Sequence, residues 1–173
     1  MSPAPFSRDA YGTLLLVLAV PTLLPGLGLV TAPLAGLAGL VVGVQLTLGR
    51  RAPWMPSRAR AWMDDASLGP RLSLWLQARL RLLQGLRLPR LPRVLAGLAV
   101  SWSSLLLVLP LALVPFGNMI PALALGLLGV GLAVRRSLFG WLGAALSGGY
   151  TAFLALLGEA VALMARNLAA TPS

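Results

Sequence analysis

Long apolar tracts, separated by one arginine-rich segment, dominate the pattern of residues along the chain. The three tracts run over residues 11–48, 94–134 and 138–165. A helix needs about 20 residues to cross the roughly 30 Å hydrocarbon core of a bilayer. The first two tracts are too long for one crossing and barely long enough for two. Each is therefore predicted to form either a hairpin of two short helices or a re-entrant hairpin that turns inside the bilayer, and the third a single span.

Prolines interrupt both long tracts at corresponding points. They are Pro21 and Pro25 in the first tract, and Pro110 and Pro115 in the second. Proline has no backbone N–H and clashes with the preceding helical turn, so each pair predicts a break. A side chain able to cap a helix N-terminus follows each break, Thr31 in the first tract and Asn118 in the second. We therefore expect one helix over residues 31–48 and another over 118–134.

The two broken tracts also align as an internal repeat. An ungapped offset of 90 residues superimposes residues 12–44 on 102–134. Identical positions include Pro25 with Pro115 and Ala32 with Ala122. Glycines follow each break at spacings of three and four, and small residues at that spacing let helices approach closely in lipid. These glycines are Gly36, Gly39 and Gly43 in the first half, and Gly126 and Gly129 in the second.

An arginine-rich segment separates the two halves. Residues 50–93 hold ten of the fourteen basic residues, all of them arginine, and the net charge of the chain is +10. Basic segments between apolar tracts are typical of cytoplasmic loops, so we expect this loop inside the cell and no nucleic-acid partner. Residues 71–88 place leucines and Trp75 on one helical arc and polar residues on the other. That pattern predicts an amphipathic helix at the membrane surface.

Three arginines of this helix are candidate ligands for an anionic lipid or its headgroup: Arg79, Arg81 and Arg87. Arg79 differs from the other two because it points into the apolar arc. One interpretation is that its long side chain reaches back to lipid phosphates. The other is a specific anionic site for a lipid headgroup or a diphosphate-linked ligand, and the pattern leaves both open.

The residue types needed for most catalysis are missing from the sequence. The chain has no cysteine and no histidine, and its four acidic residues are Asp9, Asp64, Asp65 and Glu159. No nucleophile has a base near it in the sequence, and no loop has the pattern of a phosphate cradle. We therefore expect no enzymatic activity, no cofactor and no metal site.

Glu159 is the one carboxylate inside an apolar tract. Its helical face carries the small residues Gly148, Ala152, Ala155 and Ala162, so we expect that face to pack against protein. An ionisable residue at membrane depth is a functional candidate by default, and burial there would suit proton coupling. The alternative is a carboxylate close to the membrane surface, paired with an arginine or a helix end.

The two proline breaks predict the position of a site. Irregular backbone at membrane depth must be shielded by protein or line a water-filled cavity. Gly28 and Asn118 occupy the same place in the two halves, where free helix N-termini would offer unpaired N–H groups to an anion. The alternative is a tight turn at the membrane surface. Candidate residues for a substrate or ion site are Gly28, Thr31, Gln45, Arg50, Gly117, Asn118 and Glu159.

Two runs of residues point to a known family. They are "PGLGLVTAPLAGLAGLVVGVQLTLGRRAPWMP" from Pro25 and "PFGNMIPALALGLLGVGL" from Pro115. Both resemble the ExoD-type exopolysaccharide synthesis membrane proteins of bacteria, and the resemblance implies a small polytopic inner-membrane protein linked to exopolysaccharide production. Family members often continue with an Arg-Asp-Gly turn, where this chain has Arg135-Arg136-Ser137 and lacks the carboxylate. The motif positions are Pro25, Gln45, Gly49, Arg50, Pro53, Trp54, Pro56, Pro115, Phe116, Gly117, Asn118, Pro121 and Ala122.

These patterns predict an all-α, polytopic integral membrane protein. Its parts would be a first helical hairpin (1–49), an arginine-rich cytoplasmic loop (50–93), a second hairpin (94–136) and a C-terminal transmembrane helix with its tail (137–173). The hairpins would form an internal repeat and could be re-entrant. We expect a homodimer in the bacterial inner membrane, because so small a chain cannot easily enclose a path alone.

The leading functional hypothesis is a transporter-like protein that supports exopolysaccharide synthesis or export and moves an anion or a proton. The alternative is a scaffold that transports nothing and holds a glycan-synthesis complex at the membrane through the arginine-rich loop. The expected partners are membrane lipids, a second copy of the chain and the exopolysaccharide machinery. An intramembrane enzyme acting on a lipid-linked sugar has the least support.

Overall fold

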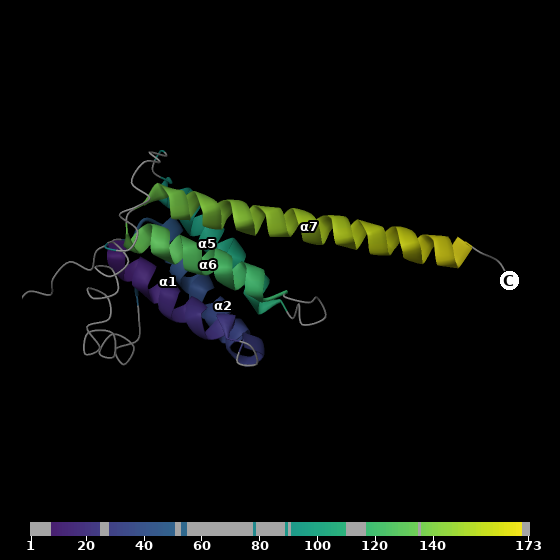
Figure 1. The fold of residues 1–173 in the computed structure, drawn as a ribbon, viewed down its shortest axis with the longest axis horizontal. Coiled ribbons are helices and arrows are strands. Elements are labelled where there is room, and N and C mark those ends of the chain that lie inside the picture. The colour runs from purple at the N-terminus through teal and green to yellow at the C-terminus, as the bar shows by residue number, and fades with distance from the viewer. Residues whose placement is uncertain are drawn as a thin grey trace, which may run out of the picture.

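The computed structural model describes residues 8–24, 28–50, 53–54, 78, 89, 91–109, 117–134 and 136–170. Within these ranges the chain is helical and has no strand, which confirms the predicted all-α class. The helices are α1 (Arg8–Leu23), α2 (Gly28–Thr47), α5 (Arg93–Val108), α6 (Met119–Ala133) and α7 (Ser137–Ala170). Four of them form a bundle, and α7 runs along this bundle and then projects well beyond it (Figure 1).

Helix boundaries agree with the prediction in the second half and differ from it in the first. Helix α6 begins after Asn118 and ends at Ala133, as predicted. However, Asn118 makes no side-chain capping hydrogen bond, so the capping role was wrong. Helix α2 begins at Gly28, which places Thr31 inside the helix instead of at its cap. Pro21 likewise lies inside α1, because a proline in the last turn removes only one hydrogen bond near the helix end.

Each hairpin packs mainly against the other hairpin. Helix α2 has its most extensive contact with α5, and α1 with α6, whereas α1 meets α2 and α5 meets α6 over smaller areas. In the repeat, α1 corresponds to α5 and α2 corresponds to α6. If the two hairpins are exchanged, the α2·α5 contact therefore becomes the α6·α1 contact. This approximate two-fold arrangement is the one that an internal repeat would produce. Ala32 and Ala122, which the repeat pairs, are both fully buried in one cluster with Leu107.

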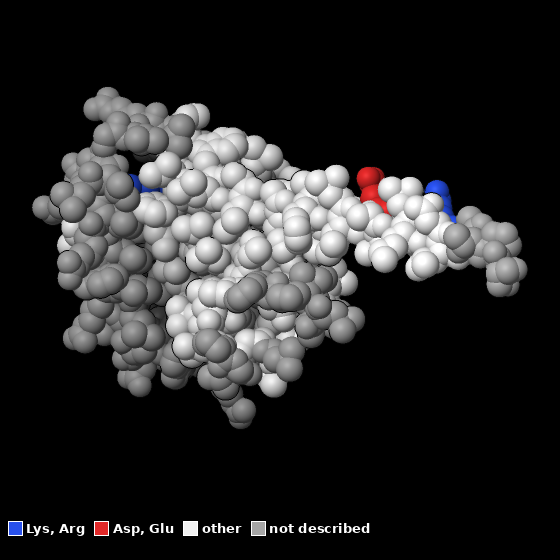
Figure 2. All heavy atoms as spheres, turned by 45° about the vertical axis from the view of Figure 1, so that its right-hand side comes forward, with Lys and Arg blue, Asp and Glu red and all other residues white. Residues whose placement is uncertain are grey.

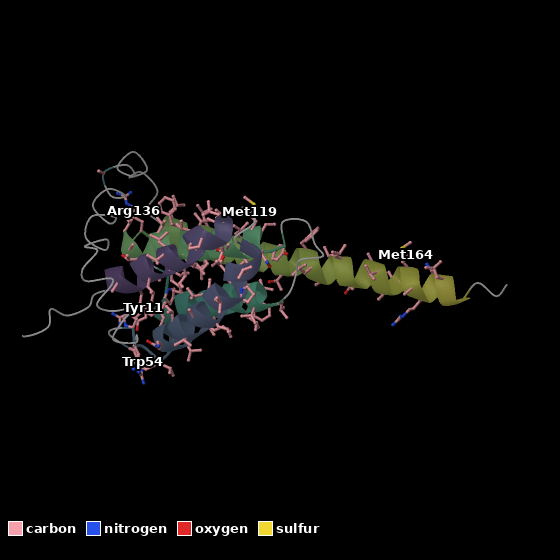
Figure 3. The ribbon with its side chains drawn as sticks, turned by 90° about the horizontal axis from the view of Figure 1, so that it is seen from below. Tyr11, Trp54, Met119, Arg136 and Met164 are labelled. Carbon is pink, nitrogen blue, oxygen red and sulfur yellow. The ribbon has the colours of Figure 1, made fainter. Side chains whose placement is uncertain are left out.

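The two hairpins point in the same direction. The Tyr11 hydroxyl near the start of α1 donates to the Arg50 carbonyl oxygen after α2, so these ends adjoin. Figure 3 shows Tyr11, Trp54 and Arg136 at this same end of the bundle, which we call the basic end. At the opposite end, the elbow end, α1 and α5 terminate and α2 and α6 begin (Figure 1). The repeats are therefore parallel to one another.

Small and polar residues fill much of the bundle, while large apolar residues cover its outside. Among the described residues, six polar ones are buried: Thr13, Thr22, Gln45, Ser103, Ser104 and Ser147. The outer face of α2 exposes 48–70% of each of five large apolar side chains: Val30, Leu34, Leu37, Val41 and Val44. Soluble proteins show the opposite preference for large aliphatic residues.

Two described helices are long and apolar enough to cross a membrane. These segments are Val30–Thr47 within α2 and Ser137–Leu168 within α7. The remaining helices are apolar but shorter, with 15 or 16 residues each, and correspond to a length of about 22–24 Å.

The second half of α7 contacts almost nothing. The helix has 34 residues, a length of about 50 Å, and beyond Thr151 nearly all its side chains are exposed. Figure 2 shows this part projecting from the body with acidic and basic atoms on it, and its charged residues are Glu159 and Arg166. The face predicted to pack against protein does not do so among the described residues, because Gly148, Ala152 and Glu159 are all exposed.

Candidate functional site

A polar contact lies at the second elbow, where α6 begins. The Tyr150 hydroxyl, on α7, donates to the Gly117 carbonyl oxygen at 2.9 Å, and this hydrogen bond is buried. The Oδ1 atom of Asn118 is also buried but has no hydrogen-bond partner among the described residues. Buried acceptors are nearly always paired, so an orphaned one calls for an explanation. The elbow therefore combines a fixed carbonyl, a tyrosine hydroxyl and an acceptor without a donor.

The first elbow has different chemistry. The Gly28 N–H donates to the Leu24 carbonyl oxygen at 3.1 Å, so it is not free to bind an anion. A Cβ at Gly28 would come within 2.6 Å of the Thr22 carbonyl oxygen, which shows how closely the two helix ends approach. Gly28 and Asn118 thus share a place in the repeat, but among the described residues only the second elbow carries an unpaired polar side-chain atom.

A row of hydroxyl groups joins α5 to α7. The Ser103 and Ser147 hydroxyls lie 3.0 Å apart in the buried interior. On the outer side, the Trp102 indole N–H donates to the Thr151 hydroxyl at 2.6 Å. Ser104 is fully buried, yet its Oγ has no partner among the described residues. The Ser103–Ser147 and Trp102–Thr151 hydrogen bonds hold the first half of α7 to the bundle.

A hydrogen-bonded turn follows α2 at the basic end. Gly49 has a φ of 70°, a conformation that favours glycine, and its N–H donates to the Leu46 carbonyl oxygen at 3.1 Å. The Arg50 N–H donates to the Gln45 carbonyl oxygen, also at 3.1 Å. Together these two bonds form the Schellman ending of a helix. The Gln45 side chain then pairs with the Trp54 backbone, accepting from its N–H at 2.5 Å and donating to its carbonyl oxygen at 3.4 Å.

This turn explains the spacing of the first motif. Gln45 is buried and Pro53 is buried, while the Trp54 side chain is 63% exposed. The Tyr11 hydroxyl adds a further bond, at 3.2 Å, to the Arg50 carbonyl oxygen. The chain therefore folds back under the end of α2, and the Trp54 indole points outward. The motif residues that hold this arrangement are Gln45, Gly49, Pro53 and Trp54.

The predicted site residues do not form one group. Gln45, Arg50, Pro53 and Trp54 meet at the basic end, while Gly28, Gly117 and Asn118 lie at the elbow end. Glu159 is on the projecting part of α7, nine residues or about 13 Å along the helix beyond Tyr150. Thr31 is half-buried within α2, and Pro121 is buried in the first turn of α6. The remaining candidates lie outside the described residues: Pro25, Pro56, Arg79, Arg81, Arg87, Pro115 and Phe116. Of the amphipathic helix predicted over 71–88, the structure describes Ala78, which is helical and exposed.

Sequence reasoning missed the partners of these residues. Tyr150 contacts the second elbow, and Ser103 and Ser147 form the buried bond between α5 and α7. A signal was available, because each is a polar residue inside an otherwise apolar tract, where polar groups often join neighbouring helices.

Comparison with known proteins identifies the family. The family described as "Exopolysaccharide synthesis, ExoD" matches residues 4–156. "Protein ExoD" of Rhizobium meliloti (strain 1021) is 28% identical over 159 residues, which cover 82% of this chain. The matched region spans only 60% of the length of that relative. No solved structure matches the chain. The family match over most of the chain confirms the resemblance seen in the two motifs, and the chain belongs to the ExoD family of exopolysaccharide synthesis proteins.

Proposed function

We propose that this chain is a multi-pass protein of the bacterial inner membrane that supports exopolysaccharide synthesis or export in a transporter-like manner. The membrane placement is supported by the inverted distribution of side chains. Leucines and valines face outward along α2, while serines, threonines and glycines pack inside. In water so large an apolar surface would need a cover, whereas in lipid small and polar residues hold helices together.

The observation that carries the transport proposal is the orphaned Oδ1 of Asn118. It is buried at the N-terminus of α6, beside a carbonyl that already accepts from Tyr150. An amide side chain offers an acceptor at one end and two donors at the other, so rotation lets it serve a cation or an anion. A solute passing the elbow would provide the missing partner. Broken helices in parallel repeats place solute sites in this way in several transporter folds.

A path for the solute would lie between copies of the chain. The centre of the described bundle is filled by Val100, Leu125 and Leu128, which are at most 1% exposed. We therefore propose a homodimer whose second elbows face a shared path. Crosslinking in membranes or native mass measurement should show a dimer, and a purely monomeric chain that still transports would contradict this part of the proposal.

Flux in liposomes tests the site. Purified chain is reconstituted with entrapped pyranine to report protons, or with an entrapped chloride-sensitive dye to report an anion. The variant Asn118→Ala should lower the flux at least about tenfold, as expected if one buried hydrogen bond to a charged solute is lost. Asn167→Ala makes the same change on the exposed end of α7 and should leave the flux unchanged. Equal flux in Asn118→Ala and the unaltered protein would remove the proposed site.

The alternative function is a scaffold for a glycan-synthesis complex. It is supported by the tight packing of the elbow end, where Ala32, Ala122 and Leu107 are fully buried, and by the paired N–H of Gly28. A scaffold acting through the arginine-rich loop would lose exopolysaccharide production when arginines of 50–93 are replaced, but not with Asn118→Ala. The two functions are thus separated by measuring polysaccharide yield in cells that carry each variant.

A further inference from the structure

Three arginines from distant parts of the chain lie at the basic end of the bundle. Arg50 follows α2, where its carbonyl oxygen accepts from Tyr11 in α1. Arg93 opens α5, whose first turns pack against the end of α2, since a Cβ at Gly97 would lie 2.6 Å from the backbone nitrogen of Thr47. Arg136 follows α6 and lies at the same end (Figure 3). We call the surface formed by Arg50, Arg93, Arg136, Trp54 and Trp141 the basic face.

Among the described residues, the basic face has little negative charge to balance it. Asp9 is the only acidic residue that the described backbone places at this end, and Arg8 stands beside it at the start of α1. The other acidic residue among the described positions, Glu159, lies on the projecting part of α7. Arg50 and Arg93 are exposed and Arg136 is half-buried, so all three guanidinium groups are available to a ligand.

The position of Arg93 is the informative one. Cations stabilise the C-terminal end of a helix, which accounts for Arg50 after α2. Arg136 follows α6 but also stands directly before Ser137, the first residue of α7. Arg93 instead occupies the first position of α5, where the helix dipole is positive, and no acidic residue lies in that first turn. The arrangement is unfavourable in the isolated chain. An anion bound outside the helix would interact favourably with both the Arg93 guanidinium and the free backbone N–H groups of the first turn.

Two indoles flank the arginines. Trp54 is 63% exposed and is held on fixed backbone by the amide of Gln45. Trp141, in the second turn of α7, is exposed and its indole N–H donates to the Pro89 carbonyl oxygen at 3.0 Å. Tryptophans that expose a ring beside arginines are typical of the level of lipid headgroups in membrane proteins.

We propose that the basic face binds the phosphates of anionic lipid headgroups. Each guanidinium can donate two parallel hydrogen bonds to one phosphate, and the indoles fix the face at headgroup depth. The face would orient the bundle with this end toward the cytoplasmic leaflet, whose surface is negative. This inference rests on the membrane placement in the proposed function and is independent of transport.

Native mass spectrometry of the purified full chain tests the inference. Binding of phosphatidylglycerol is compared with binding of phosphatidylcholine with the same acyl chains. The unaltered protein should prefer the anionic lipid. In the triple variant Arg50→Gln, Arg93→Gln, Arg136→Gln, the preference for the anionic lipid should fall at least about fivefold. This is the effect expected from the loss of even one arginine at a charged surface. Arg166→Gln, which makes the same change on the projecting part of α7, should retain the preference.

A stability measurement isolates Arg93. In phosphatidylcholine, Arg93→Gln should not lower the melting temperature, because it removes a cation from a helix N-terminus. In phosphatidylglycerol, the variant should gain less thermal stability from the lipid than the unaltered chain does. A variant that is destabilised equally in both lipids would show a structural role for Arg93 and overturn its assignment to the lipid site.

The outcomes separate this inference from the membrane placement. If the chain fails to float with phosphatidylcholine liposomes after an alkaline wash, the membrane placement is wrong. The chain could instead float while the triple variant keeps a preference for phosphatidylglycerol within twofold of that of the unaltered protein. In that case only the lipid site is wrong. Equal affinity of the pure chain for both lipids would also overturn the site and would favour an acidic protein as the partner of the basic face.

Discussion

The two main helix contacts of the bundle correspond to each other in the repeat but use different side chains. In the α2·α5 contact, glycines of α2 lie against serines of α5. A Cβ at Gly43 would come within 2.7 Å of the backbone nitrogen of Ser101, and one at Gly39 would overlap the Ser104 hydroxyl. In the α1·α6 contact, a Cβ at Gly129 of α6 would lie 3.0 Å from the Gly12 carbonyl oxygen and 3.1 Å from the Cβ of Leu15, an alkyl side chain.

The difference shows what a close helix contact in this protein requires. Both helices of each pair carry glycine at points of close contact, so two backbones can approach. The facing residue can be a hydroxyl, as in the α2·α5 contact, or an alkyl group, as in the α1·α6 contact. In lipid there is little hydrophobic drive between helices, so the distance of approach matters more than the polarity of the facing side chain.

The largest expected effect comes from filling the closest points of both contacts. A Cβ at Gly12 would overlap the backbone of Ala133 and Gly129, and one at Gly43 would press on the Ser101 backbone. Because backbone atoms cannot move aside, Gly12→Ala and Gly43→Ala should each lower the free energy of unfolding by about 2–3 kcal/mol. Titration with SDS in mixed micelles, followed by tryptophan fluorescence, measures this. Gly148→Ala, with nothing within 4 Å, is the control.

A smaller effect tests the hydroxyl chemistry of the α2·α5 contact. At Gly39 the nearest obstacles are the Oγ and Cβ of Ser104, not backbone. Gly39→Ala alone should therefore destabilise the fold by about 1–2 kcal/mol. In the Ser104→Ala background the loss should shrink by about 1 kcal/mol, because residues in contact do not act independently. Additive effects of the two substitutions would mean that the hydroxyl does not limit the approach.

Two neighbouring serines give the next comparison. Ser103 donates to the Ala99 carbonyl oxygen at 2.9 Å and contacts Ser147, so Ser103→Ala should lower the free energy of unfolding by about 1 kcal/mol. Ser104 has a buried hydroxyl without a partner, so Ser104→Ala should change it by less than about 0.5 kcal/mol or raise it. The same titration measures both. A loss in Ser104→Ala as large as that in Ser103→Ala would reveal a partner for the Ser104 hydroxyl.

The smallest effect is expected at the open point of the α1·α6 contact. A Cβ at Gly126 would lie 3.6 Å from the Ala19 Cβ, an ordinary contact distance. Gly126→Ala should be neutral or stabilise the protein by up to about 1 kcal/mol, since alanine favours the helix. Gly36, its counterpart in the repeat, would meet the Ser104 carbonyl oxygen at 2.7 Å, so Gly36→Ala should destabilise. Equal responses would remove the distinction between the two contacts.

Several features could be predicted because they depend on residues close together in the chain. The length and hydropathy of the tracts predicted helices throughout, and the helix after Asn118 was placed correctly. The motif around Gln45 and Trp54 was identified as specific, but its physical basis was not. That basis is a side-chain to backbone pair spanning nine residues, which a residue pattern alone does not reveal.

The candidate site was harder to predict, because its groups come from distant segments. Tyr150 reaches Gly117 across 33 residues, and Ser147 reaches Ser103 across 44. The role expected of Glu159 required another part of the protein to pack against its helical face. The fold places that face outside the bundle. The N-terminus at Gly28 was expected to be free, yet the adjacent turn pairs its N–H.

The sequence by itself determined the helical class, the two broken hairpins and the basic segment between them, because each follows from the composition and periodicity of a short stretch. Only the tertiary structure decided that each hairpin packs on the other, that Arg50, Arg93 and Arg136 lie at one end of the bundle, and that half of α7 projects from it. Glycines and serines permit close contact with many partners, so the choice among them depends on how all the helices fit together.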